Sequence, residues 1–124
     1  MIKVSHAQLS RAKQLHLPKL SETELNAGTV VLDVTVKSSA GIGRLFAPTW
    51  PMVMGTKSGE MPVASYAARY RDVYLAARAS GAVRRLFELT RGCDELMLLC
   101  YCAENKFCHR LLLCAWLSSD FLTF

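Results

Sequence analysis

The chain has 124 residues, of which 52% are hydrophobic and 20% are charged, and its formal net charge is +5. This length is typical of one domain with its own core, and the composition excludes an intrinsically disordered chain. No apolar run reaches the ~18 residues of a membrane-spanning helix, and the N-terminal MIKVSHAQLS lacks the apolar segment of a signal peptide. We therefore predict a single cytoplasmic domain over residues 1–124 with no membrane partner. The positive charge favours an anionic partner.

The five cysteines are predicted to be reduced thiols. Their odd number, the lack of a secretion signal and the apolar surroundings of Cys100, Cys102 and Cys114 are typical of a cytosolic protein. Cys100 and Cys102 are also unsuited to a disulfide, because residues i and i+2 of a strand stand about 7 Å apart.

Two strands are predicted in the first third of the chain. Ile2 to Val4 suggests a short strand, and residues 6–25 suggest a loop with at most a turn of helix, in which His6 and His16 are surface imidazoles. The segment TVVLDVTVK is rich in β-branched residues and predicts a strand over Thr29–Val36.

An aspartate inside this second strand needs a physical reason, because burying a carboxylate without partners is costly. Asp33 either accepts hydrogen bonds from N–H groups of the following loop, or reaches a ligand site at the carboxyl end of the strand. Open parallel sheets place their ligand sites at that end. The sequence leaves both roles open.

Residues 38–59 are predicted to form a long loop with a functional role, because such loops are uncommon inside compact domains. Gly41-Ile42-Gly43 is not followed by the third glycine and the helix of a dinucleotide-binding fingerprint. Trp50, flanked by two prolines, either anchors the loop to the body of the protein or stacks on a ligand.

Two helices are predicted after this loop. The first begins at Pro62 and turns a row of tyrosines to the core, and the second runs over Ala82–Arg91 and ends at Gly92. Their six arginines form a basic patch, which consists of Arg69, Arg71, Arg78, Arg84, Arg85 and Arg91. A solvated helical face is the commoner reason for such a patch, and no aromatic-interleaved basic motif indicates nucleic-acid readout.

Residues 96–117, LMLLCYCAENKFCHRLLLCAWL, predict a buried strand, a short loop and a helix that begins near Cys108. Such a helix directs the free N–H groups of its first turn at whatever lies above the strand. Cys108, His109 and Arg110 fall at this point, which makes them the best site candidates.

Each of these three residues suggests a chemical role. Cys108 is a candidate nucleophile, because a helix N-terminus and a nearby arginine lower the pKa of a thiol. His109 is a candidate proton carrier, and Arg110 offers a planar fork for phosphate or carboxylate at the rim of the site. The alternative for Cys108 is a small buried residue that closes the helix N-terminus, since reactivity depends on exposure.

A metal site is not favoured by the spacing of the cysteines. Cys100, Cys102, Cys108 and His109 are suitable ligand types for zinc, but they do not follow a standard zinc pattern, and Cys100 is expected inside the sheet. We therefore predict no metal and no other cofactor.

These elements predict a single α/β domain with three layers around a short, mostly parallel sheet, whose central strands are Thr29–Val36 and Leu96–Tyr101. The carboxyl ends of parallel strands meet at one edge of a sheet. We therefore expect four further residues to complete the wall of the site, namely Asp33, Thr35, Trp50 and Lys57.

Four blocks of the sequence carry a family resemblance: LDVTVK (32–37), LFAPTWPMVMGTK (45–57), SYAARY (65–70, with Tyr66 and Tyr70) and LLCYCAENKFCHRLLL (98–113). They resemble a family of small bacterial and phage proteins known as domain of unknown function 488. The blocks cover most of residues 29–117, and the Cys-His-Arg block is fairly specific. The resemblance implies a compact α/β fold with its characteristic residues at loop ends, and it implies no established reaction. Family members commonly continue past the last helix into another short segment, whereas this sequence stops at Phe124.

The leading functional prediction is an enzyme-like pocket for a small phosphorylated or nucleotide-type anion. Arg110 and the helix N-terminus would bind the anion, and Cys108 or His109 would carry the chemistry. The alternative is a non-catalytic binding or inhibitor protein, such as a phage protein that sequesters a nucleotide or blocks a host protein or nucleic-acid complex. The sequence leaves the reaction and the oligomeric state open.

Overall fold

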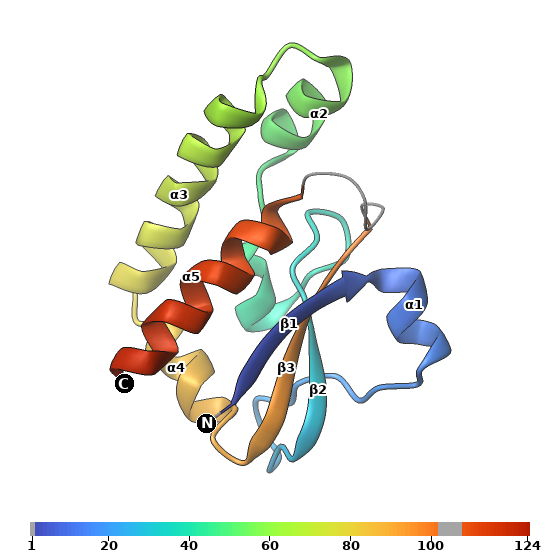
Figure 1. Cartoon of the computed structure of the whole chain (residues 1–124), viewed down its shortest axis with the longest axis vertical. Helices are drawn as coiled ribbons and strands as arrows, with labels where there is room; N and C mark the ends of the chain where they lie inside the picture. Colours follow the sequence, from blue (N-terminus) through green and yellow to red (C-terminus); the bar gives the residue numbers. More distant parts are fainter. Residues whose placement is uncertain (1, 102–107) are drawn as a thin grey trace.

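The computed structural model describes residues 2–101 and 108–124. Figure 1 shows its strands and helices, which are β1 (Lys3–Gln8), α1 (Leu9–Gln14), β2 (Gly28–Asp33), the 3-10 helix η1 (Gly41–Phe46), α2 (Trp50–Ser58), α3 (Val63–Ala79), α4 (Ala82–Leu89), β3 (Cys93–Cys100) and α5 (His109–Thr123). Among the helices in these ranges, none combines the length and the apolar character that crossing a bilayer requires.

The three strands form one parallel sheet in the order β1-β3-β2. The last strand in the sequence, β3, is therefore the central one and is covered on both faces, as its apolar run predicts. Leu96 and Leu98 lie in the main core on one face, whereas Leu99 lies on the other face. Side chains alternate along a strand, so Cys100 lies on the same face as Leu96 and Leu98. The predicted small α/β domain with a parallel sheet is confirmed.

Helices cover the two faces of the sheet unequally (Figure 1). The main core lies between the sheet and η1, α3, α4 and α5, and its fully buried side chains include Phe46, Tyr70, Leu86, Leu113 and Leu117. On the other face, Leu9 and Ala12 of the short helix α1 pack near Val31 and Leu99. Because α5 follows β3 on the main-core side, its first turn lies at the carboxyl edge of the sheet.

The first strand is longer than predicted. It ends at Gln8 instead of Val4, and α1 follows it directly, so the prediction of a loop from residue 6 is wrong. The polar sequence of β1 shows no strand pattern, because this strand is stabilised by pairing with β3 over its full length. Strand β2 is shorter than predicted and ends at Asp33, whose side chain accepts a hydrogen bond from the N–H of Thr35 at 2.9 Å and so turns the chain.

The prediction of a loop over residues 38–59 is also wrong, because this segment contains η1 and α2. The hydroxyl of Thr49 accepts a hydrogen bond from the N–H of Met52 at 3.4 Å and caps α2. Pro51 stands in its first turn, and Gly59 ends it with a φ of 80°. These start and stop signals were present in the sequence, but α2 lacks the apolar periodicity that identifies a helix.

Gly43 of η1 packs against the end of β2, and a Cβ at this position would overlap the backbone carbonyl of Asp33. We therefore expect Gly43→Ala to lower the free energy of unfolding by about 1–3 kcal/mol, as overpacking does in cores. Urea denaturation measures this. Gly55→Ala is the control, because a Cβ there meets no backbone atom and only the milder contacts with Cβ and Cε of Met61 at 3.1 and 3.3 Å. Equal losses in the two variants would contradict the close contact between η1 and β2.

Candidate functional site

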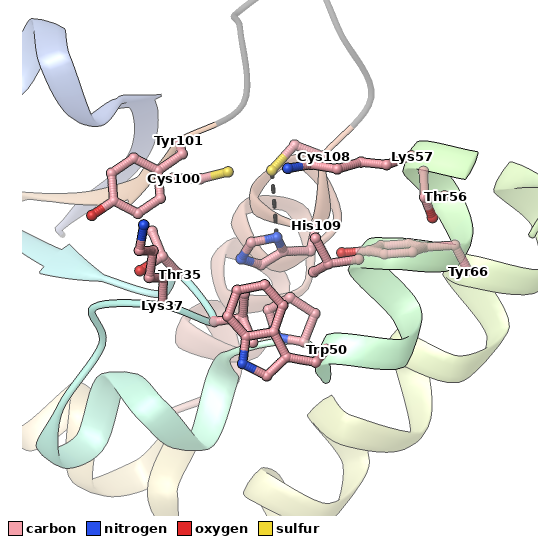
Figure 2. Close-up of a pocket in the computed structure, with 13 residues that line it drawn as sticks. Thr35, Lys37, Trp50, Thr56, Lys57, Tyr66, Cys100, Tyr101, Cys108 and His109 are labelled. Carbon is pink, nitrogen blue, oxygen red and sulfur yellow. Dashed lines mark hydrogen bonds between the residues drawn. The ribbon is translucent and has the colours of Figure 1, made fainter. Parts of the chain in front are cut away.

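A cavity of about 400 Å³ lies at the carboxyl edge of the sheet. It is lined by the loop after β2, by α2 and the residue Pro48 before it, by the first turn of α3, by the end of β3 and by the start of α5 (Figure 2). Its volume lies within the range of about 300–1,000 Å³ that is usual for small-molecule sites. Because open parallel sheets bind their ligands at this edge, the cavity is the candidate functional site.

Cys108 and His109 form the buried side of the cavity and are 2% and 4% exposed. Cys108 has extended backbone and precedes α5, and His109 is the first helical residue. The Sγ atom of Cys108 lies 3.4 Å from Nδ1 of His109, and Nε2 of His109 lies 2.7 Å from the carbonyl oxygen of Val34. A carbonyl oxygen only accepts, so Nε2 carries a proton. In the neutral ring, Nδ1 therefore presents its lone pair to the thiol.

Tyr70 of α3 supports the imidazole of His109 from the core. The two rings meet edge to face, with their centroids 5.2 Å apart. The hydroxyl of Tyr70 donates a hydrogen bond to the carbonyl oxygen of Phe46 at 2.6 Å, and burial raises the pKa of Tyr70, so it stays protonated. The imidazole of His109 is thus held by the hydrogen bond of its Nε2 and by the packing of Tyr70. These two contacts fix the direction of Nδ1.

Cys100 brings a second thiol to this place. It is the last residue of β3, and its Sγ, the Sγ of Cys108 and a ring nitrogen of His109 all lie within 4.8 Å of one another. Figure 2 shows the two thiols pointing toward each other above the imidazole. Cys100 lies inside the sheet as expected, since it pairs with Gln8 of β1 and is buried, and at the end of its strand its side chain also reaches the cavity. Cys102, the remaining member of the set considered for zinc, lies outside the described residues.

Among the described residues, those that line the cavity include two lysines and no acidic residue. Lys37 and Lys57 are exposed and approach from opposite sides in Figure 2. Trp50, which is 51% exposed, forms a further wall. Thr35 also lines the cavity, and its hydroxyl oxygen accepts a hydrogen bond from the N–H of Ser38 at 2.9 Å. The structure therefore gathers most of the predicted site residues at one cavity, namely Thr35, Trp50, Lys57, Cys108 and His109.

Arg110 does not line the cavity. Its side chain is fully buried, and its Nε donates a hydrogen bond to Nδ1 of His6 on β1 at 3.3 Å. The prediction of an arginine at the rim is wrong, because successive helical residues point about 100° apart. His109 faces the cavity, and Arg110 consequently faces β1.

Asp33 does not line the cavity either. One oxygen of its carboxylate accepts the bond from Thr35, and the other accepts a hydrogen bond from the hydroxyl of Ser38. It borders a separate hollow between α1 and the sheet. These contacts match the structural alternative for Asp33, in which the carboxylate holds the loop after β2.

Several residues of the cavity wall were not predicted as site residues, among them Lys37, Tyr66 and Tyr101. Lys37 follows the carboxyl end of β2, so the rule that placed Thr35 at the site applies to it equally. Tyr66 was assigned to the core with the other tyrosines of α3, and its position in the first turn of that helix brings it to the cavity.

The cysteines of the described ranges should differ in reactivity. Burial raises the pKa of the Cys93 and Cys114 thiols, so both are protonated at pH 7 and gain thiolate only as the pH rises above the ordinary value. Cys108 faces the cavity, which admits a small reagent. We expect iodoacetamide at pH 7 to label Cys108 before Cys93 and Cys114, as read by peptide mapping. Labelling of Cys93 first would contradict this placement.

Comparison with known families adds one finding. The family model described as "Active DUF488-N3 subclade" matches residues 34–120, more than two thirds of the chain. The matched range contains every residue that lines the cavity. No curated protein and no solved structure shows a significant match to the chain. The chain therefore belongs to the domain of unknown function 488 family, within its DUF488-N3 subclade.

Proposed function

We propose that the cavity binds a small phosphorylated, nucleotide-type anion in the cytoplasm. The observation that carries this proposal is the meeting of Lys37, Lys57 and Trp50 at one cavity without an acidic residue in its described lining. Lysine binds phosphate as a point charge, and an exposed aromatic ring stacks on a nucleobase. The net charge of +5 assists the approach of an anion. In this proposal the lysines hold the anion, since Arg110 is buried against β1.

We further propose that Cys108 and His109 carry the chemistry. Both line the cavity and are held in a fixed relation to each other, and reacting atoms must meet their catalytic groups at defined distances. The description of the matched subclade as active supports catalysis over passive binding.

The alternative is a non-catalytic protein that binds nucleic acid or a host protein through the arginines of α3 and α4. Two of these arginines already contact the last residues of the chain. Arg78 pairs with Asp120 at 3.4 Å, and the guanidinium of Arg84 lies 4.6 Å from the centre of the Phe124 ring. These contacts give part of the basic patch a packing role, so the cavity is the better supported site.

A panel of nucleoside mono-, di- and triphosphates, with inorganic phosphate included, tests the proposal. A ligand of the cavity should raise the melting temperature by an amount that grows with the logarithm of its concentration above Kd, and chromatography should show it being consumed. Binding without consumption would favour a sequestering protein over an enzyme. The absence of any melting shift or turnover across the panel would contradict the proposal.

A further inference from the structure

Three side chains at the inner end of the cavity have the composition of a metal site. Cys100, Cys108 and His109 supply two sulfur ligands and one imidazole, the ligand types that zinc prefers. All three are buried, and their donor atoms converge within 4.8 Å of one another. We propose that these residues bind a zinc-type divalent cation.

The distances suit a tetrahedral ion. Zinc bonds of about 2.3 Å to sulfur and about 2.0 Å to nitrogen place neighbouring ligand atoms roughly 3.5–3.8 Å apart. Cys108 Sγ and His109 Nδ1 already stand 3.4 Å apart. The widest separation in the group is below 4.8 Å, so closing around an ion needs shifts of about 1 Å at most. Rotations of the two cysteine side chains provide shifts of this size.

The surroundings of His109 are those of a metal ligand. Zinc-bound histidines usually donate their second ring N–H to a carbonyl or carboxylate, which fixes the tautomer. Nε2 of His109 donates to the carbonyl oxygen of Val34 at 2.7 Å, which leaves Nδ1 directed at the cluster. Tyr70 packs against the same ring and limits its rotation.

With the described residues as its ligands, the ion would have a coordination position open to the cavity. Structural zinc sites use four protein ligands, whereas catalytic sites use three and keep the fourth position for water or substrate. The cluster has three members within residues 2–101 and 108–124, and all three line the cavity. A cation here would bind water or an oxygen atom of a ligand held by Lys37 and Lys57. The inference adds a cation to the cavity and does not depend on which anion binds. With the ion bound, Cys108 and His109 would serve as its ligands instead of as nucleophile and proton carrier, and the roles proposed above apply to the metal-free chain.

The spacing of these residues along the sequence does not indicate a metal site, because the ligands come from the end of β3 and the start of α5. The parallel sheet brings these two ends together at its carboxyl edge. The metal proposal therefore replaces the expectation, drawn from the spacing and from the place of Cys100 in the sheet, that the chain holds no metal.

Cobalt titration of the purified full chain, stripped with EDTA, tests the metal site directly. We expect one Co²⁺ per chain, with the thiolate-to-cobalt charge-transfer absorption and the intense visible bands of a four-coordinate ion. Zinc should displace the cobalt and abolish these bands. Cys108→Ser and Cys100→Ser should each weaken binding by more than about 100-fold, beyond the 10–100-fold typical of losing an outer-shell partner.

Cys93→Ser is the matched control, because Cys93 is a buried cysteine at the opposite end of β3 and should leave cobalt binding unchanged. The spectrum of the wild-type chain keeps the proposal testable even if a ligand variant fails to fold. Absence of the thiolate absorption, or equal weakening by Cys93→Ser, would overturn the proposal. Nucleotide binding by the EDTA-treated chain is measured separately, so failure of the metal site is distinguished from failure of the proposed anion site.

Discussion

Replacing Arg110 by alanine is expected to lower the free energy of unfolding by about 3–5 kcal/mol, the range for large buried side chains cut to alanine. Arg110 is fully buried and joins the first turn of α5 to His6 of β1. The substitution leaves a void between these elements and removes the guanidinium N–H that donates a hydrogen bond to His6. Both effects destabilise the folded state. Urea denaturation measures the loss.

Arg69→Ala is the control for this prediction. Arg69 is an exposed arginine on α3, and its removal should change stability by no more than about 0.5 kcal/mol. An arginine that bound an anion at the rim would behave differently. Its loss would leave the melting temperature unchanged and abolish ligand binding, and that result would contradict the position of Arg110 against β1.

Cys108→Ala is expected to reduce turnover of the ligand found in the nucleotide panel by at least about 100-fold, the lower end of what one positioned catalytic group contributes. The thiol lies beside Nδ1 of His109 at the inner end of the cavity, so its removal disables the proposed reaction centre. Binding of the anion should persist, because Lys37 and Lys57 remain. Steady-state rates and a melting-shift titration measure the two effects separately.

Cys93→Ala serves as the control for turnover, since it removes a buried thiol from the same protein at the other end of β3. It should keep the wild-type rate. If Cys108→Ala also kept the wild-type rate, Cys108 would be a packing residue that closes the start of α5, which is the alternative left open by the sequence.

The sequence predicts the core of the fold well where local pattern and tertiary structure agree. The apolar run of β3 and the apolar helix after it identify the central strand and α5, and the residues at their junction indicate Cys108 and His109. The rule for parallel sheets then places Thr35 at the same edge. These inferences need only the periodicity and hydrophobicity of the sequence and the topology of a parallel sheet.

Other features depend on contacts that a sequence does not display. The polar strand β1 is stable because β3 pairs with it, and α2 forms without an apolar stripe. The direction of Arg110 depends on where α5 begins, since a start one residue later would rotate its side chain by about 100°. The convergence of Cys100 with Cys108 depends on how closely the end of β3 approaches α5. Each of these features depends on contacts between segments that are distant in the sequence, and not on a local conformational preference.

The fluorescence of Trp50 during nucleotide titration tests the central claim most directly. The only other tryptophan, Trp116, is partly buried and stacks on Tyr70 with their ring centroids 5.7 Å apart, away from the lining of the cavity. A nucleotide in the cavity should therefore quench Trp50 saturably, and Trp50→Phe should remove the signal. Lys37→Ala combined with Lys57→Ala should weaken binding at least tenfold, or about 1.4 kcal/mol, whereas Lys3→Ala at the opposite edge of the sheet should not. A nucleotide-dependent signal that survives Trp50→Phe, or the absence of quenching across the whole panel, would contradict a nucleotide site in this cavity.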